Sequence, residues 1–295
     1  MVKSVKYTFQ GQTYNLTLND DTGKYEATIT SPQKSSYKEP DHKYGGKIDA
    51  EDDAGNTTTV DQTHSSLGES LKIRVIEKVA PTISITYPTS GAFITNANPE
   101  IRFTVSDSDS GINETSIQLL IDSQPITGEI QKSESGDGYE CSYTPDVALD
   151  DGSHTITVNV MDNDGNSANE QTQSFTIDTT PPTLEITQPT EGLITNSNSV
   201  TVIGTTNDIT SKPVTLTING EIVEVQSDGN FEKEVSLISG NNQITIIATD
   251  KAGKSTTIVR NVILDTGAPV IHSITITPNP VDAGKTFIIS VEVTD

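Results

Sequence analysis

Acidic residues recur at one constant spacing along this sequence. Three acids that each lie three or four residues before a proline are followed 30 positions later by another acid, and the pairs are Glu77 with Asp107, Asp178 with Asp208, and Asp265 with Asp295. Carboxylates that converge in a fold repel one another unless a cation or a hydrogen-bond donor lies between them. The repeated pairs therefore point to a set of related sites.

Further acids join these pairs if the intervening chain forms β-sandwiches. Asp162 and Asp164 lie in one turn rich in aspartate and glycine, and Asp250 lies in another. Such a turn, the loop that holds the second acid of a pair and the start of the first strand all lie at one end of a sandwich. The predicted metal ligands are Glu77, Asp107, Asp109, Asp162, Asp164, Asp178, Asp208 and Asp250.

Calcium is the cation that suits converging carboxylates, because it takes several oxygen ligands with loose geometry. Such an ion would stiffen the connections between repeats. The alternative is that each aspartate caps its own turn by accepting hydrogen bonds from backbone N–H groups. Lys251 directly follows Asp250 and argues against a cation in the last set. Both interpretations stay open at this point.

The residues that enzymes commonly use are scattered or missing. Histidines at positions 42, 64, 154 and 272 lack the spacing of metal ligands, and we expect His154 to lie at a turn or a strand edge. Cys141 shares a predicted strand face with Tyr139 and Tyr143, so we expect its thiol to pack in a core. No phosphate-binding loop or nucleophile elbow is present. We predict no catalysis and, calcium apart, no cofactor.

The charge of the chain narrows its partners. Its 41 acidic and 18 basic side chains give a net charge of −23, which disfavours nucleic acid and anionic membrane surfaces. The sequence has no run of about 18 apolar residues that would span a bilayer. No apolar segment typical of a secretory signal follows Met1. We expect no nucleic-acid partner, no membrane insertion and no signal peptide.

The elements that must position the acids follow from an internal repeat. The stretch at 80–88 (APTISITYP) recurs at 181–189 (PPTLEITQP) and again at 268–278 (APVIHSITITP). Proline suits the ends of an edge strand, because it has no N–H group to donate to a sheet. Each copy is therefore a predicted first strand. Alternating segments with turns rich in aspartate and glycine follow at 48–56, 160–166 and 247–254, and these are predicted closing hairpins.

The third repeat shows the strand pattern most clearly. We predict six further strands there, over 200–205, 214–218, 221–225, 231–235, 243–249 and 256–263. Asn219-Gly220 is a predicted two-residue hairpin turn. Seven short strands at this spacing are typical of an immunoglobulin-like sandwich. The predicted fold class is all-β, with tandem immunoglobulin-like sandwiches in an elongated array.

The repeats also set the predicted domain boundaries. We place a divergent first domain at 1–79, a second at 80–179, a third at 180–266, and a partial fourth unit of two strands at 267–295. The first domain departs from the pattern, because it lacks the proline-led strand and carries a long polar insert over 57–70.

The proline-led units closed by Asp-Gly turns resemble bacterial Ig-like repeat domains, and the linker at 178–183 (DTTPPT) is typical of that class. The chain as a whole resembles Ig-like proteins encoded among the phage tail genes of Gram-positive bacteria. This resemblance implies a structural protein of the virion tail, with other tail proteins or a host-surface glycan or protein as partners. It agrees with the lack of a signal peptide, because virions leave the cell by lysis.

Two other functions fit the same modules. The chain would serve as a stalk fragment of a secreted bacterial surface adhesin, on the extracellular surface. It would also serve as an accessory module that binds polysaccharide. Neither alternative requires a catalytic residue.

The last two predicted strands, at 271–277 and 286–293, lack the rest of a sandwich. Two strands alone are marginally stable, and an exposed apolar face usually meets a partner. We expect them to pack on the third unit, to self-associate, or to add to a tail protein by β-augmentation, unless they are the frayed end of a longer array. The predicted partner-binding residues are Ile274, Ile276, Phe287, Ile289, Val291 and Val293.

Overall fold

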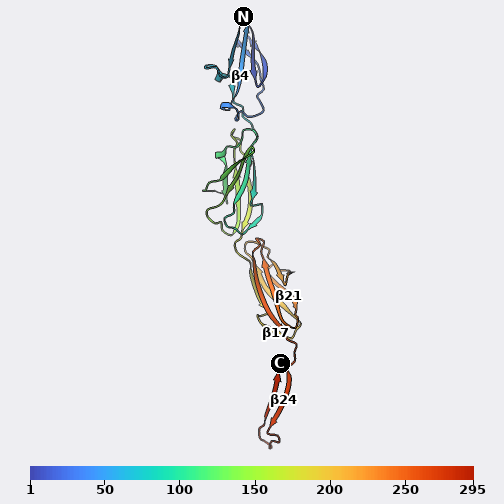
Figure 1. Ribbon diagram of the computed structural model, residues 1–295. Coiled ribbons are helices and arrows are strands. Elements are labelled where there is room, and N and C mark those ends of the chain that lie inside the picture. Colours follow the sequence, from blue (N-terminus) through green and yellow to red (C-terminus); the bar gives the residue numbers. More distant parts are fainter. The chain divides into compact units, whose positions relative to one another are not determined.

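The computed structural model describes residues 1–295, and β-strands make up almost all of its regular structure (Figure 1). The helical segments are three short 3-10 turns: η1 (Pro40–His42), η2 (Gly68–Leu71) and η3 (Glu114–Ser116). None of its helices has the length and apolar character needed to cross a membrane. The chain divides into two compact units, Met1–Ile177 and Asp178–Asp295, and each is described by itself.

The N-terminal part of the first unit is one connected antiparallel sheet in the order β3-β2-β1-β4-β5, with β6 also paired to β4. Its buried core is small and consists of Phe9, Tyr44 and Val75. Because so few apolar side chains are available, this region lacks the two separate sheets seen later in the chain. The strands are β1 (Val2–Phe9), β2 (Gln12–Asn19), β3 (Lys24–Glu26), β4 (Tyr44–Asp52), β5 (Thr57–Asp61) and β6 (Lys72–Ile73).

The rest of the first unit is a two-sheet sandwich, with sheets in the orders β12-β13-β9-β7 and β11-β10-β14-β15-β8. Alternate residues of its strands fill the core, and Phe103 and Phe175 are the largest fully buried side chains. The strands are β7 (Thr82–Tyr87), β8 (Ala92–Ile94), β9 (Ile101–Ser106), β10 (Gln118–Ile121), β11 (Gln124–Pro125), β12 (Gln131–Ser135), β13 (Gly138–Tyr143), β14 (Gly152–Asn159) and β15 (Gln171–Ile177).

The second unit begins with a similar sandwich, with sheets in the orders β16-β18-β21 and β17-β23-β22-β19-β20. The six strands predicted in this region are confirmed. Asn219 and Gly220 both have positive φ angles and connect β19 to β20 as a two-residue turn. The strands are β16 (Thr183–Gln188), β17 (Leu193–Thr195), β18 (Ser199–Asn207), β19 (Thr215–Ile218), β20 (Glu221–Val223), β21 (Asn230–Ser236), β22 (Gly240–Thr249) and β23 (Ser255–Leu264).

The proline-led segment crosses between the two sheets in both sandwiches. In the first sandwich, β7 pairs antiparallel with β9, and the chain then changes sheets so that β8 pairs parallel with β15. In the second, β16 pairs with β18 and β17 pairs parallel with β23 in the same way. This crossing places the start of each sandwich beside the loops at one of its ends.

The last two strands, β24 (Val270–Thr277) and β25 (Ile288–Thr294), form a two-stranded antiparallel sheet of their own. The register pairs Ile274 with Val291 and Ile276 with Ile289. These four side chains are exposed, as are those of Phe287 and Val293. The structure therefore leaves the predicted partner-binding residues uncovered, and their role stays a prediction.

Two single-residue expectations have different outcomes. Cys141 is buried in the core of the first sandwich, and Tyr139 and Tyr143 pack in the same core, as expected. The expectation for His154 is wrong, because it lies within β14 and is only 8% exposed. Its ring is held there by Asp122 Oδ2, at 2.7 Å from Nδ1, and by the Asp150 carbonyl, at 2.8 Å from Nε2. These acceptors satisfy both ring nitrogens, so burial does not cost it its hydrogen bonds.

Candidate metal centres

Three predicted ligands converge at one end of the sandwich in the second unit. Asp208 directly follows β18, Asp250 directly follows β22, and Asp178 lies five residues before β16. Pairing of Thr183 with Asn207 brings the start of β16 next to the end of β18. One carboxylate oxygen from each acid lies within 4.8 Å of the others, and the exposed fractions of the residues are 0%, 4% and 6% for Asp178, Asp208 and Asp250. We call this group the Asp178 triad.

Each member of the Asp178 triad also closes a local turn. Asp208 Oδ1 accepts hydrogen bonds from the N–H groups of Thr210 and Ser211, at 2.8 and 2.7 Å. Asp250 Oδ1 accepts from the N–H of Lys254 at 2.9 Å. Such Asx turns are the capping predicted as the alternative to calcium. They use only one oxygen of Asp208 and of Asp250.

The second oxygen of Asp250 is different, because Oδ2 is buried and has no hydrogen-bond partner. Leaving a carboxylate oxygen buried without a donor costs free energy on the order of 1–3 kcal/mol or more. The third acid of the triad, Asp178, accepts from Thr180 through Oδ1 and from the Ser211 hydroxyl through Oδ2. A bare oxygen thus lies in a group of buried acids.

A corresponding group lies at the equivalent end of the first sandwich. Glu77, Asp107 and Asp162 are 6%, 6% and 1% exposed, and one oxygen from each lies within 4.8 Å of the others. We call this group the Glu77 triad. Asp107 Oδ1 accepts from the N–H groups of Asp109 and Gly111, at 3.0 and 2.9 Å. The capping pattern is therefore repeated in both sandwiches.

The Glu77 triad differs from the Asp178 triad in the donors to the aspartate of its closing turn, Asp162. Asp162 Oδ1 accepts from the N–H groups of Asp164 and Asn166, and Asp162 Oδ2 accepts from the Asn166 side-chain amide at 2.6 Å. Glu77 accepts from the N–H of Ser110 at 2.7 Å. Burial raises the pKa of the Glu77 carboxyl, the Ser110 N–H opposes this, and repulsion by Asp107 adds to it.

Two predicted ligands, Asp109 and Asp164, are not part of either triad. Both oxygens of Asp109 lie within hydrogen-bond distance of the Ser35 N–H, at 3.1 and 3.0 Å. Asp164 Oδ2 accepts from the N–H of Glu77 at 3.1 Å, and Oδ1 lies 3.5 Å from the Arg74 guanidinium. These two acids fasten the N-terminal part of the first unit to its sandwich, and a ligand role for them stays a prediction.

Sequence reasoning missed that each triad includes a serine at the same position in its sandwich. Ser110 and Ser211 each lie 33 residues after the acid that precedes the sandwich, Glu77 or Asp178. Ser110 donates its N–H to Glu77, and Ser211 donates its hydroxyl to Asp178. The constant interval was visible in the sequence. The third acid pair behaves differently, because Asp265 and Asp295 are both exposed.

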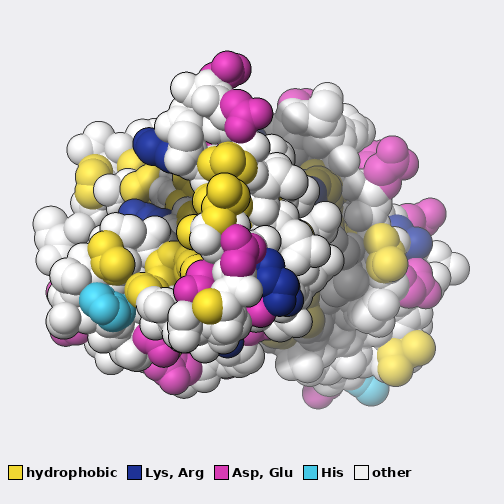
Figure 2. All heavy atoms as spheres, turned by 90° about the horizontal axis from the view of Figure 1, so that it is seen from above, with side chains coloured by type: hydrophobic (Ala, Val, Ile, Leu, Met, Phe, Trp, Pro, Cys, Tyr) yellow, Lys and Arg dark blue, Asp and Glu magenta, His cyan; other side chains and the backbone are white.

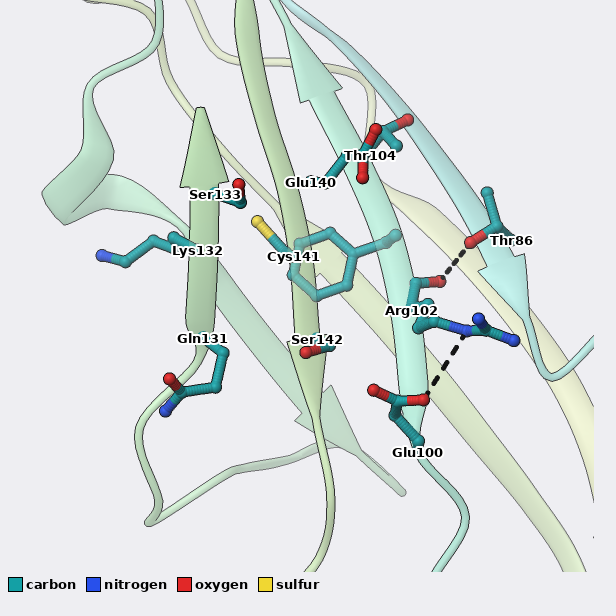
Figure 3. Close-up of a pocket in the computed structure, with 11 residues that line it drawn as sticks. Thr86, Glu100, Arg102, Thr104, Gln131, Lys132, Ser133, Glu140, Cys141 and Ser142 are labelled. Atoms are coloured by element: carbon teal, nitrogen blue, oxygen red, sulfur yellow. Dashed lines mark hydrogen bonds and ion pairs between the residues drawn. The ribbon is translucent and has the colours of Figure 1, made fainter. Parts of the chain in front are cut away.

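A hollow of about 630 Å³ lies on the solvent-facing side of the sheet β12-β13-β9-β7 in the first sandwich (Figure 3). Outward-facing polar side chains of β9 and β13 line it, and Arg102 lies 3.9 Å from the Glu100 carboxylate. Cys141 also lines it, but burial raises the pKa of that thiol to about 11. A thiol that stays protonated is not a nucleophile. Cys141 is therefore not an activated nucleophile in this hollow.

The acids that gather in the triads are buried, whereas other acids are dispersed on the outside. In the space-filling view, Asp and Glu side chains are scattered over the visible face and do not form one patch (Figure 2). The visible Lys and Arg side chains are few. The buried triads are the places where three acids bring their oxygens within 4.8 Å of one another.

Comparison with known families agrees with the two sandwiches. Residues 81–158 match the family described as Bacterial Ig domain, and residues 182–266 match the family described as Glucodextranase, domain B. The chain is built of tandem Ig-like domains. Ig-like and fibronectin-like families are generally non-catalytic, and bacterial Ig domains are typically extracellular or on a surface.

One curated relative is Bacillopeptidase F of Bacillus subtilis (strain 168), 28% identical over 184 residues, which are 60% of this chain and 12% of the relative. The Ig-like chain thus spans about an eighth of the length of that protein.

Similar solved structures include the fibronectin(III)-like modules of Clostridium thermocellum CbhA, an I-band fragment from titin, and a tetra-tandem repeat in the extending region of a large adhesion protein. Their TM-scores are 0.38, 0.42 and 0.32, and their identities are 17%, 12% and 17%. The matches cover 62%, 90% and 98% of this chain and 94%, 88% and 79% of the other chains, in the same order.

Proposed function

We propose that the chain is a structural component of a phage tail or virion surface, where its Ig-like domains serve assembly or weak adhesion to the host surface. The observation that carries a non-catalytic function is the use of the buried acids. They lie where the chain enters each sandwich and close turns there, instead of lining the hollow on the sheet β12-β13-β9-β7. The buried carboxylates thus connect the segment that leads into each sandwich to the loops at the same end.

The placement on a virion rests on the sequence resemblance to Ig-like proteins of phage tails. The match to a bacterial Ig domain supports a surface-exposed module. The net charge of −23 favours solubility and mutual repulsion between copies, which suits a protein displayed in several copies.

Immunogold electron microscopy would test this proposal. Antibodies against the full chain are applied to lysates of the bacterium that carries the gene, with particles from a deletion strain as the control. We expect label on tails or on virion surfaces. Label confined to the cell wall, with none on particles, would contradict the proposal and favour a stalk of a surface adhesin.

A second candidate function is an accessory module of a larger extracellular enzyme. Two observations favour it: the 182–266 match to a glucodextranase domain, and the partial match to Bacillopeptidase F. A glycan array probed with the full chain distinguishes the two candidates. Binding to α-glucans that a soluble competitor displaces would support the accessory module, and an array without signal would count against it.

A further inference from the structure

We propose that the Asp178 triad binds Ca²⁺ and that it does so more tightly than the Glu77 triad. Two independent observations meet at this place. Three carboxylates that are 94% or more buried bring oxygens within 4.8 Å of one another. One of them, Asp250, has a buried oxygen, Oδ2, without any hydrogen-bond partner.

The hydrogen bonds to the carboxylates of the triad come from neutral donors. Asp178, Asp208 and Asp250 accept from backbone N–H groups and from the hydroxyls of Thr180 and Ser211. These groups are neutral, so they orient the carboxylates but leave the negative charges facing one another. Like charges in a buried site are strongly unfavourable. A divalent cation removes this repulsion and supplies the missing partner for Asp250 Oδ2.

The size and chemistry of the group favour calcium over magnesium. Ca²⁺ binds six to eight oxygens at about 2.3–2.6 Å, in flexible geometry. Oxygens on opposite sides of the ion are then up to about 5 Å apart, and the three triad oxygens all lie within 4.8 Å of one another. Mg²⁺ requires oxygens at about 2.0–2.1 Å in a nearly ideal octahedron and keeps several waters. Hydrogen bonds already hold the Asp208 and Asp250 carboxylates in their turns, so the looser coordination geometry of calcium suits them better.

One substitution within a shared turn explains why the two triads differ. The turns that begin at Asp162 and Asp250 share a backbone bond, in which the aspartate N–H donates to the carbonyl of the residue four positions on. In each turn the aspartate Oδ1 also accepts the N–H of that residue. That residue is Asn166 in the first turn, and its amide also satisfies Asp162 Oδ2. Lys254 takes its place in the second turn and has no amide. Asp250 Oδ2 is therefore left for a cation.

Asp52 provides a matched control within the same chain. Its Oδ1 accepts from the N–H groups of Ala54 and Asn56, and its Oδ2 accepts from the Asn56 amide. This is the same turn as at Asp162, but Asp52 belongs to neither triad. A change at Asp52 thus tests turn capping alone.

If the chain has the proposed structural function, a bound calcium ion would fasten the segment before β16 to the rest of the sandwich. Asp178 precedes β16, whereas Asp208 and Asp250 belong to loops that follow β18 and β22. A shared ligand ties these three segments together, and each would otherwise depend on hydrogen bonds alone. Binding of calcium itself does not depend on where the protein is displayed, so its test is separate from immunogold labelling.

The test uses the full chain after treatment with a chelator, titrated with calcium chloride by isothermal calorimetry. The variants are Asp208→Asn and Asp250→Asn. The asparagine Oδ1 still accepts the backbone N–H groups, so the turns persist while a charge is lost. We expect each variant to weaken the tightest calcium site by at least about tenfold. Asp52→Asn should leave it unchanged, and Asp107→Asn should leave the tightest site intact.

Melting curves with and without calcium separate an ion site from a purely structural role. We expect calcium to raise the melting temperature of the unaltered chain by mass action. Asp250→Asn should melt no lower than the unaltered chain without calcium, because it relieves repulsion, and should gain nothing when calcium is added. The proposal is wrong if the unaltered chain binds no calcium at millimolar concentration. It is also wrong if magnesium binds equally well, or if Asp107→Asn alone abolishes the tightest site.

Discussion

At the scale of single residues, each aspartate carboxylate has two oxygens. One oxygen can cap a turn while the other binds a cation. Asp208 and Asp250 close their turns through Oδ1. Capping therefore occurs, and it does not exclude a cation, because Oδ2 takes no part in it. The capping bonds even fix the direction of the second oxygen. The two interpretations of the acid pattern are thus compatible, and the partner of Oδ2 distinguishes Asp250 from Asp162.

We expect the single thiol, Cys141, to resist modification in the folded protein. It is 3% exposed, and burial raises its pKa to about 11. A thiol-disulfide reagent at pH 8 should therefore label the native chain far more slowly than the chain in denaturant. Rapid labelling of the native chain with one equivalent would contradict this. Because the chain has no other cysteine, the rate of labelling reports unfolding of the first sandwich.

The pair of His154 and Asp122 should make that sandwich sensitive to pH. Burial lowers the pKa of His154, but the Asp150 carbonyl and the Asp122 carboxylate accept from its ring nitrogens, and the net effect raises the pKa above the ordinary value of 6.5. Both acceptors are satisfied at once only by the doubly protonated ring. The stabilisation is therefore complete below pH 6.5 and is lost as the pH rises through the folded pKa.

The measurement is Cys141 labelling in urea, at pH 5.5 and pH 9, for the unaltered chain and Asp122→Asn. We expect Asp122→Asn to lower the free energy of unfolding by about 1 kcal/mol at pH 5.5, since the pair is partly exposed, and by less at pH 9. Glu224→Gln, an exposed change of the same charge, should have no such effect. A loss for Asp122→Asn that is equal at both pH values would show that the histidine charge is irrelevant.

At the scale of elements, close approach between strands fixes the position of the proline-led segment. Gly204 lies in the middle of β18, where a Cβ atom would come within 2.2 Å of the Glu185 carbonyl in β16 and within 2.7 Å of the Phe231 ring. The carbonyl belongs to the backbone and cannot move away without breaking the pairing of the strands. Glycine at this position thus lets β16 lie against β18, which in turn sets Asp178 near Asp208.

Gly204→Ala should therefore destabilise the second unit. Forcing an extra methyl group into a packed region typically costs about 1–3 kcal/mol, and the backbone contact favours the upper end of that range. Chemical denaturation followed by circular dichroism would measure the loss, and calcium affinity should fall with it. Thr201→Ala, at an exposed position of the same strand, is the control. If Gly204→Ala left the free energy of unfolding unchanged, the close approach of β16 and β18 would not be needed for stability.

At the scale of the whole molecule, the last two strands are the part that most needs a partner. They form a sheet of two strands, and such a hairpin is only marginally stable in water. Its pairs Ile274 with Val291 and Ile276 with Ile289 place apolar side chains on one face. An exposed apolar face of this kind favours association. Self-association competes here with the repulsion that a charge of −23 imposes on each copy.

We expect the full chain to associate through this face at high salt, where the repulsion is screened. Light scattering at rising protein concentration would detect dimers or larger species. Ile274→Glu combined with Ile276→Glu should abolish them. Ile209→Glu should not, because Ile209 is 92% exposed and lies in another part of the chain. A chain that stays monomeric at high salt would exclude self-association through this face.

The sequence by itself determined six strands of the sandwich in the second unit and the acids that form the triads. Alternation of apolar residues has a period of two in any strand that covers a core, and proline and glycine mark the ends. The interval of 30 residues between Glu77 and Asp107 is repeated between Asp178 and Asp208. In both sandwiches the first acid lies five residues before the first strand and the second directly follows the third strand. Local rules of this kind need no knowledge of distant contacts.

Only the tertiary structure decided which of the predicted ligands form the triads and which form hydrogen bonds or ion pairs elsewhere. Asp109 and Asp164 looked like ligands in the sequence, but the first residues of the chain fold beside them and supply Ser35, Arg74 and the Glu77 N–H. The sequence also did not reveal that Asp250 Oδ2 lacks a hydrogen-bond partner. This depends on whether a side-chain donor lies within reach of that oxygen in the folded turn. Hydrogen bonds are short and directional, so their partners are settled by three-dimensional packing and not by spacing along the chain.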